Sequence, residues 1–184
     1  MLRDWLASGD SLPDGVVVDL ELRWRILLRL AKLGGVDRDQ LAAELAEETT
    51  AVSQVEHAKA LAALPDAEAK AWAWERFTGE VEVPNYELEA IGLGLWQVGQ
   101  EPLTDPYVAR YFDEVLATTE VRSSQMLAVA TNIFYPRWSA TDDTVARAHA
   151  LLARDNVDST IRRELVDETW DLERRLAIRQ AFGR

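Results

Sequence analysis

Cysteine is missing from this 184-residue sequence, which excludes disulfide bonds, thiolate catalysis and zinc sites built from cysteine. Only two histidines are present, and neither His57 nor His149 belongs to an HExxH motif or another paired-ligand spacing. No stretch approaches the roughly 18 apolar residues of a transmembrane helix, and the opening MLRDWLASGD does not have the pattern of a signal peptide. We therefore expect a cytoplasmic chain that has no metal site and binds no cofactor.

Positive charge is also scarce. The 20 Lys and Arg residues are outnumbered by 32 Asp and Glu residues, so the formal net charge is −12. A strongly negative chain repels phosphate backbones and anionic lipid surfaces. The expected partners therefore include neither nucleic acid nor a membrane.

Patterns of catalytic residues are lacking. The carboxylates fall in polar helical stripes, such as the one with Glu44, Glu47 and Glu48, and solvated helix faces explain them better than acid–base catalysis. Gly92 and Gly94 lie inside a helical pattern, not in a phosphate-binding loop, so we expect them to allow a close approach between helices. The sequence therefore predicts no catalytic residues in this chain.

Residues that start or end helices recur along almost the whole sequence, and no window shows the sustained alternation of apolar and polar residues that is typical of strands. The first long helix is expected from near Asp19 to a stop at Gly34–Gly35. Asp105–Pro106 is interpreted as an N-cap followed by proline at the first helical position, and Thr141 as the N-cap of a later helix. The sequence therefore predicts an all-α fold of about ten helices.

The spacing of the helices predicts the architecture. Alternate helices are expected to start near Asp19, Ala51, Asn85, Arg122 and Asp158, which is one helix pair about every 35 residues. This period favours a right-handed superhelix of antiparallel helix pairs with a concave face, and a compact irregular bundle is the alternative. We expect a short N-terminal helix with a linker over residues 1–15 and a single helical-repeat domain over 16–184.

The histidines and tryptophans are interpreted as packing residues. His57 lies in line with Leu61 and Leu64, and His149 lies on a similar helical face, so both are expected in a core or an interface. Trp72 and Trp74 are two residues apart, so they cannot face the same side of a helix. Core packing is the expected role of the tryptophans within helices, which include Trp170.

Arg23 is the one candidate for a functional residue. On its helix it points away from the exposed charged stripe and toward the apolar side. A charge there must be paired or must reach a cavity, and Asp19, four residues earlier, is the simplest partner. The alternative is that Arg23 faces a concave surface and meets a peptide carboxylate or a neighbouring domain.

The ordered segments VVVDLELRWRILLRLAKLGG, LAAELAEETTAVSQVEHAKALAALPDAEAKAWAWERF and VPNYELEAIGLGLWQVGQEPLTDPYVARYFDEV resemble the C-terminal region of bacterial aminopeptidase N, particularly of the actinobacterial type. The later IFYPRWSATDDTVARAHALLA and the arginine-rich final helix fit the same region, so the resemblance covers the chain from about Leu12 onward. None of these segments is a catalytic signature, and the resemblance rests on their order.

The resemblance implies a superhelix of HEAT-like helix pairs that closes over a zinc-dependent catalytic domain, walls an internal cavity and limits the access of peptides. The zinc ligands of the family, in HExxH and a distant glutamate, have no counterpart here. The implied partners are therefore the catalytic domain of the same enzyme and its peptide substrate, and Arg23 is the residue expected to face the cavity. A free-standing helical-repeat scaffold that binds a protein or peptide on its concave face is the main alternative, and a small-molecule-binding bundle is a more distant one.

Overall fold

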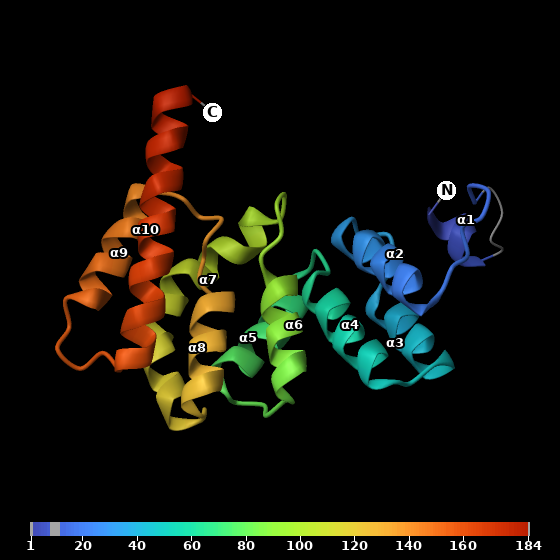
Figure 1. The fold of residues 1–184 in the computed structure, drawn as a ribbon, viewed down its shortest axis with the longest axis horizontal. Coiled ribbons are helices and arrows are strands. Elements are labelled where there is room, and N and C mark those ends of the chain that lie inside the picture. Colours follow the sequence, from blue (N-terminus) through green and yellow to red (C-terminus); the bar gives the residue numbers. More distant parts are fainter. Residues whose placement is uncertain (1, 8–11, 184) are drawn as a thin grey trace.

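The computed structural model describes residues 2–7 and 12–183, and in these ranges every regular element is a helix (Figure 1). The α-helices are α1 (Leu2–Ala7), α2 (Leu20–Lys32), α3 (Arg38–Glu47), α4 (Ala51–Ala62), α5 (Ala67–Thr78), α6 (Asn85–Leu95), α7 (Glu101–Glu114), α8 (Ser124–Ile133), α9 (Asp142–Leu152) and α10 (Ser159–Phe182). A 3-10 helix, η1 (Val115–Glu120), joins α7 to α8. The all-α prediction with about ten helices is confirmed.

Short polar side chains start most of these helices. The side chain of Asp19 accepts a hydrogen bond from the Leu22 amide at 2.8 Å, and Thr141 caps α9 in the same way. Asp37 forms a capping box with Gln40 at the start of α3. Helices α6, α7 and α8 differ, because none of the three has a side-chain hydrogen bond at its N-cap.

The prediction for the start of α7 is wrong. The helix begins at Glu101, four residues before the expected cap at Asp105, and Pro106 lies inside it. Pro102 occupies the first turn, where its missing N–H costs nothing, and Pro106 removes a single backbone hydrogen bond further along. Two prolines so close together are compatible with one helix only when the first stands at the helix start.

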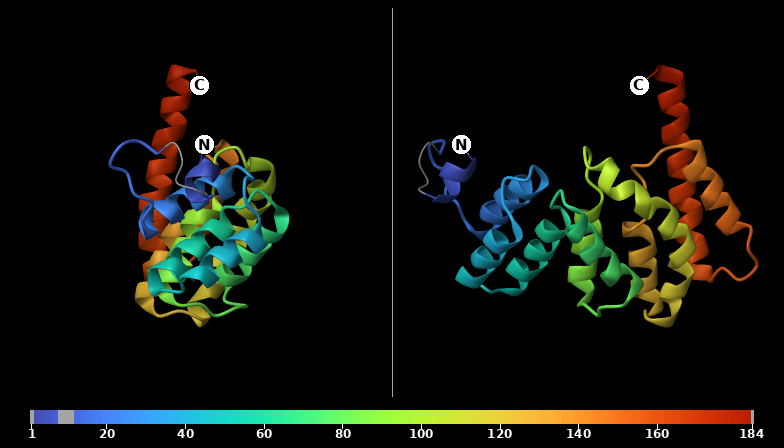
Figure 2. Two further views of the ribbon diagram at one scale, coloured as in Figure 1. Left: turned by 90° about the vertical axis from the view of Figure 1, so that its right-hand side faces the viewer. Right: turned by 180° about the vertical axis from the view of Figure 1, so that it is seen from behind.

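The helices form an elongated two-layer stack with the described ends of the chain at opposite ends of its long axis (Figures 1 and 2). In one layer α2 packs on α4, α4 on α6, α6 on α8 and α8 on α10. In the other, α5 packs on α7 and α7 on α9. Contacts between alternate helices are those expected for stacked helix pairs. The right-handed sense of the superhelix and the domain boundary near residue 16 stay predictions, and part of the linker expected within residues 1–15 lies outside the described residues.

Buried side chains tie the C-terminal ends of neighbouring helices together. Lys70 Nζ donates to the carbonyls of Ala62 at the end of α4 and Leu95 at the end of α6, at 2.8 and 3.1 Å. Gln100 Nε2 donates to the carbonyls of Lys32 and Ala63, at the ends of α2 and α4. The last carbonyls of a helix have no partner within the helix, so these donors satisfy groups that would otherwise be buried unpaired. The shared donors also show that α2, α4 and α6 run in the same direction.

Gly92 and Gly94 allow α6 to approach both neighbours in its layer. A Cβ atom at Gly92 would collide with Ile133 and Phe134 at the end of α8. A Cβ atom at Gly94 would collide with the backbone carbonyl of Lys59 on α4. The predicted role of the two glycines in close helix packing is confirmed.

We expect a Gly94→Ala substitution to lower the free energy of unfolding by about 1–3 kcal/mol, the usual cost of overpacking. Alanine gains about 1 kcal/mol of helix propensity, but the obstacle at this site is a backbone carbonyl, which cannot rotate away as a side chain could. Urea unfolding followed by circular dichroism measures the effect. Leu93→Ala is the control, because Leu93 lies between the glycines and is exposed. An unchanged or stabilised Gly94→Ala variant would contradict the close contact.

The apolar core divides into two clusters. The smaller one lies among α2–α5 and includes Trp24 and Leu41, and the larger one lies among α4–α10 and includes Trp74 and Phe134. Trp74 is buried and Trp72 half-buried, which confirms that they face different sides. Trp170 is 58% exposed, so its predicted place in the core is wrong. None of the helices in the described ranges is both long and apolar enough to cross a membrane.

Candidate functional site

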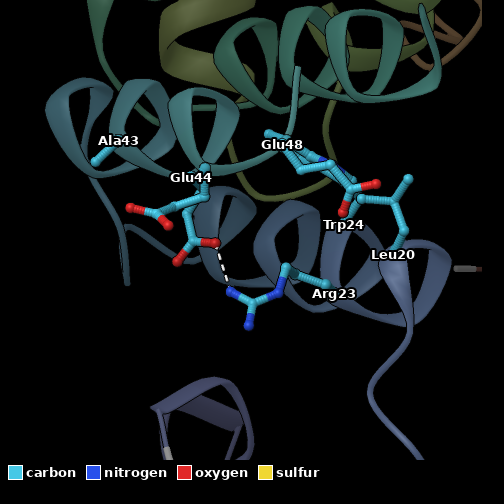
Figure 3. Close-up of a pocket in the computed structure, with 7 residues that line it drawn as sticks. Leu20, Arg23, Trp24, Ala43, Glu44 and Glu48 are labelled. Atoms are coloured by element: carbon cyan, nitrogen blue, oxygen red, sulfur yellow. Dashed lines mark hydrogen bonds and ion pairs between the residues drawn. The ribbon is translucent and has the colours of Figure 1, made fainter. Parts of the chain in front are cut away.

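The predicted candidate Arg23 lines a pocket of about 480 Å³ between α2 and α3, which we call the Arg23 pocket (Figure 3). Its lining residues are Leu20, Arg23, Trp24, Ala43, Glu44, Glu47 and Glu48. Helix α2 contributes the first three, and the polar face and C-terminal end of α3 contribute the others. The apolar stripe of α2 turns Trp24 inward, so Arg23, one residue earlier, lies at the pocket rim.

Arg23 is paired with Glu44. Its Nη1 donates to Oε2 of Glu44 at 2.6 Å, and the two side chains are 36% and 26% exposed (Figure 3). The prediction of an ion pair with Asp19 is wrong, because the Asp19 carboxylate is already used as the N-cap of α2. A charge four residues away on the same helix was the simplest partner in sequence, but α3 brings a closer one from another element.

The Arg23 pocket is acidic overall. Three carboxylates and one guanidinium line it, and Glu44 neutralises that guanidinium. Such a site favours a cationic group, such as an ammonium or guanidinium, over a carboxylate. Its lining residues include no hydroxyl, thiol or amine nucleophile.

His57 lies next to the Arg23 pocket, behind Trp24. The two rings meet edge to face with their centroids 6.1 Å apart, and the buried Nε2 of His57 has no hydrogen-bond partner. Burial lowers the pKa of His57, and the positive charge of Arg38 lowers it further. The half-buried ring packed on Trp24 confirms the packing role expected from the sequence.

The core position expected for His149 is wrong, and its alternative place in an interface stays a prediction. Its side chain is exposed rather than packed in a core, and its Nε2 lies 2.6 Å from Oε1 of Glu173 on α10. Helix α9 lies at the outer end of the stack, and its face with His149 meets the polar side of α10. Among residues 2–7 and 12–183, no three His, Asp or Glu side chains are placed so that they could hold a metal ion.

We expect an Arg23→Leu substitution to lower the free energy of unfolding by less than about 1 kcal/mol, because the pair with Glu44 is partly exposed to solvent. Arg25→Leu is the matched control, since Arg25 forms a more exposed pair with Glu21 on the same helix. Chemical unfolding of both variants measures the difference. A loss of several kcal/mol for Arg23→Leu would show that the pair is a buried structural element, contrary to its exposure here.

Two cationic residues that the fold buries wholly or partly, Lys70 and Arg122, were not predicted from the sequence. Lys70 is fully buried, and it lies three, four and seven residues before Ala73, Trp74 and Phe77 on the buried face of α5. Arg122 is half-buried between α5 and α8 with one hydrogen bond, from its Nη2 to the carbonyl of Arg76 at 2.8 Å. The helical spacing from Lys70 to Ala73, Trp74 and Phe77 is a sequence signal for its burial. No comparable signal marks Arg122, because its surroundings come from helices distant in the chain.

Comparison with known proteins gives one family. The model of the ERAP1-like C-terminal domain matches residues 1–175. The chain belongs to the ERAP1-like C-terminal domain family. It is also similar to Aminopeptidase N of Streptomyces lividans, with 33% identity over 180 residues, which cover 98% of this chain and 21% of that protein. The chain thus spans about a fifth of the length of this relative, and the resemblance to aminopeptidase N seen in the sequence is confirmed.

The aminopeptidase relatives of this family generally use zinc, so the residues of this chain are compared with the needs of a zinc site. Among residues 2–7 and 12–183 the two histidines do not fit a zinc site, because His57 packs on Trp24 and the distant His149 pairs with a single carboxylate.

Proposed function

We propose that this chain is the non-catalytic C-terminal domain of a zinc-dependent aminopeptidase. In this proposal it walls the substrate cavity and controls the access of peptides to a separate catalytic domain, which holds the zinc. The observation that carries the proposal is the match of the ERAP1-like C-terminal domain model to residues 1–175. The partners are the catalytic domain of the same enzyme and the peptide substrate.

The surface of α10 supports a docking role. Val166, Trp170, Arg174, Ile178 and Phe182 recur every four residues along the helix, and we call this set the α10 stripe. The four apolar members are 50%, 58%, 50% and 78% exposed. The C-terminal end of α10 extends beyond the other helices of the stack (Figure 1).

An exposed row of large apolar side chains is typical of a surface that meets a partner. Arg174 lies over the Trp170 ring at 5.3 Å, so the stripe combines aromatic and guanidinium groups, which are common at the centres of protein interfaces. In our proposal the catalytic domain covers this stripe, and the stack behind it forms the cavity wall.

The test uses the full enzyme that contains this chain. A Trp170→Asp/Ile178→Asp double variant should weaken the docking of this domain on the catalytic domain, because two carboxylates would be buried without partners at the interface. We expect the enzyme to lose its discrimination against long or folded substrates, while it still cleaves aminoacyl anilides. Turnover measured against a series of peptide lengths gives the answer.

Val52→Asp is the matched control, because Val52 is equally exposed but lies in the first turn of α4, away from the stripe. An unchanged length profile in the double variant, with the same fold by circular dichroism, would contradict the proposal. A profile altered equally by Val52→Asp would also contradict it, because the effect would then be unspecific.

A further inference from the structure

A second pocket, of about 390 Å³, lies where the end of α5 meets the starts of α6 and α8, and we call it the Arg122 pocket. Its polar lining includes Arg76, Glu82, Asn85, Arg122 and Ser123. The starts of α6 and α8 lie at the same edge of the stack (Figure 1). The pocket therefore brings two guanidinium groups together with two helix N-termini.

Arg122 has no acidic partner. No ion pair joins it to a carboxylate in the described part of the chain, and its buried Nη1 has no hydrogen-bond acceptor. Its other contacts are the carbonyl of Arg76 and the ring of Phe77, whose centroid is 5.8 Å away. A half-buried guanidinium usually has a carboxylate beside it, and acidic residues are abundant in this chain.

Arg76 is only weakly neutralised. Its Nη1 donates to the carbonyl of Trp72 at 2.9 Å and lies 3.7 Å from Glu75, and its guanidinium stacks on the Trp72 ring at 4.1 Å. Two other carboxylates are near: Glu82 lines the pocket with an exposed side chain, and Glu87, in the first turn of α6, acts on Arg76 without forming an ion pair with it. Two arginines thus share a cavity in which neither has a close, well-formed ion pair.

The helix ends add to the positive potential. The first amides of a helix have no partner within it, and their partial positive charge attracts anions. Asp19, Thr50 and Asp158 satisfy such amides at α2, α4 and α10, whereas no side chain does so at α6 or α8. Ser123 stands at the N-cap of α8 with extended backbone, yet makes no capping hydrogen bond.

We propose that the Arg122 pocket is a binding site for a small oxyanion, held by the guanidinium groups of Arg76 and Arg122 and by the free amides at the starts of α6 and α8. A phosphate ion and the carboxylate of a peptide share this chemistry. The site is independent of the zinc enzyme proposed above, because every group that forms it belongs to this chain.

The test titrates the purified 184-residue chain with inorganic phosphate at constant ionic strength, followed by calorimetry and thermal unfolding. In parallel, an N-acetylated tripeptide with a free C-terminal carboxylate is compared with its C-terminal amide. Binding of phosphate alone assigns a free ion, and preference for the peptide acid over phosphate and over the amide assigns a peptide carboxylate. Failure of both phosphate and the peptide acid to bind overturns the proposal.

Two variants and a control show whether binding occurs in the Arg122 pocket. Arg122→Met should weaken binding at least tenfold, whereas Arg147→Met should not, because Arg147 is paired with Asp143 on the distant α9. An equal loss of binding in Arg122→Met and in the control Arg147→Met would indicate an effect of overall charge and overturn the proposal.

Ser123→Asp guards against a loss of binding that merely reflects unfolding. The new carboxylate would cap α8 and raise the melting temperature, and it would also occupy the position of the anion. We expect higher thermal stability together with at least tenfold weaker binding. Higher stability with unchanged binding would overturn the proposal.

Discussion

A Lys70→Ala substitution should destabilise the chain by about 3 kcal/mol at pH 7. Lys70 is fully buried, and its removal leaves a cavity that costs about 2–5 kcal/mol. The carbonyls of Ala62 and Leu95 would lose their donor, at about 1–3 kcal/mol each. The substitution also removes the free-energy cost of burying a charge, which is on the order of 3 kcal/mol because one unit of pKa shift corresponds to about 1.4 kcal/mol. The lost packing and hydrogen bonds outweigh the removed cost of the buried charge, and urea unfolding measures the net change in the free energy of unfolding.

The same lysine predicts a pH dependence. Burial lowers the pKa of Lys70 to about 8, against an ordinary value of 10.5. Between these two values the unfolded chain binds a proton that the folded chain has released, so stability rises with pH. The rise should be on the order of 2 kcal/mol between pH 7 and pH 9.5, with little change from Lys70 below pH 7. Above pH 10 the buried Tyr111 and Tyr135 act in the opposite sense, because burial raises the pKa of both.

Lys70→Met separates the charge from the packing. Methionine keeps most of the apolar stem but cannot titrate, so most of the rise in stability from pH 7 to pH 9.5 should disappear. A smaller rise should remain from Lys32, because burial lowers the pKa of that lysine as well. Lys59→Met is the control, because Lys59 is partly exposed beside Glu56 and should leave the rise intact. A rise that persists undiminished in Lys70→Met would show that another group causes it.

A Trp74→Ala substitution should lower the free energy of unfolding by about 3–5 kcal/mol, the usual cost of removing a fully buried aromatic side chain. The Trp74 ring is 1% exposed and lies 4.8 and 4.9 Å from the rings of Phe77 and Tyr107. Its Nε1 donates to Oε2 of Glu114 at 2.7 Å, so the substitution also removes a donor from a partly buried carboxylate. Thermal and chemical unfolding measure the loss.

Trp72→Ala is the natural control for Trp74. The two residues have the same chemistry two positions apart on α5, but Trp72 is only half-buried and its ring lies beneath Arg76. We expect its removal to cost clearly less, about 1–2 kcal/mol for half the buried area. Similar losses in both variants would contradict the assignment of Trp74 to the centre of the larger core.

The local rules of helix formation predicted most of the fold. Asp19, Thr141 and Asp158 have the side chains that cap helices, and the structure uses all three as N-caps. The glycines of α6 were also interpretable, because glycine inside a helix costs free energy and therefore indicates a packing reason. The start of α7 failed because Asp105–Pro106 satisfies the same rule that correct N-caps satisfy. The chain turns at Gly99, which has a positive φ, so the helix starts after Gln100 and not after Asp105.

The candidate site was predicted only in part, because its partners come from other elements. Helical spacing placed Arg23 on the inner side of α2 but could not indicate Glu44, 21 residues later on α3. Arg122 gave no signal, since it becomes unusual only when distant helices surround it, whereas the spacing of Lys70 from Trp74 and Phe77 could have indicated its burial. Spacing within one helix reports which side a residue faces, and tertiary packing decides what it meets there.

The close contacts at Gly92 and Gly94 have a mechanical consequence. Helix α6 meets the backbone of α4 at Gly94 and the side chains of Ile133 and Phe134 at Gly92, so it cannot slide along α4 or α8 without a collision. The middle of the stack should therefore be stiff, and any change in curvature should be confined to its two ends. Those ends hold the Arg23 pocket and the α10 stripe, so we expect these two surfaces to shift relative to a middle section, from α4 to α8, that moves as one rigid unit.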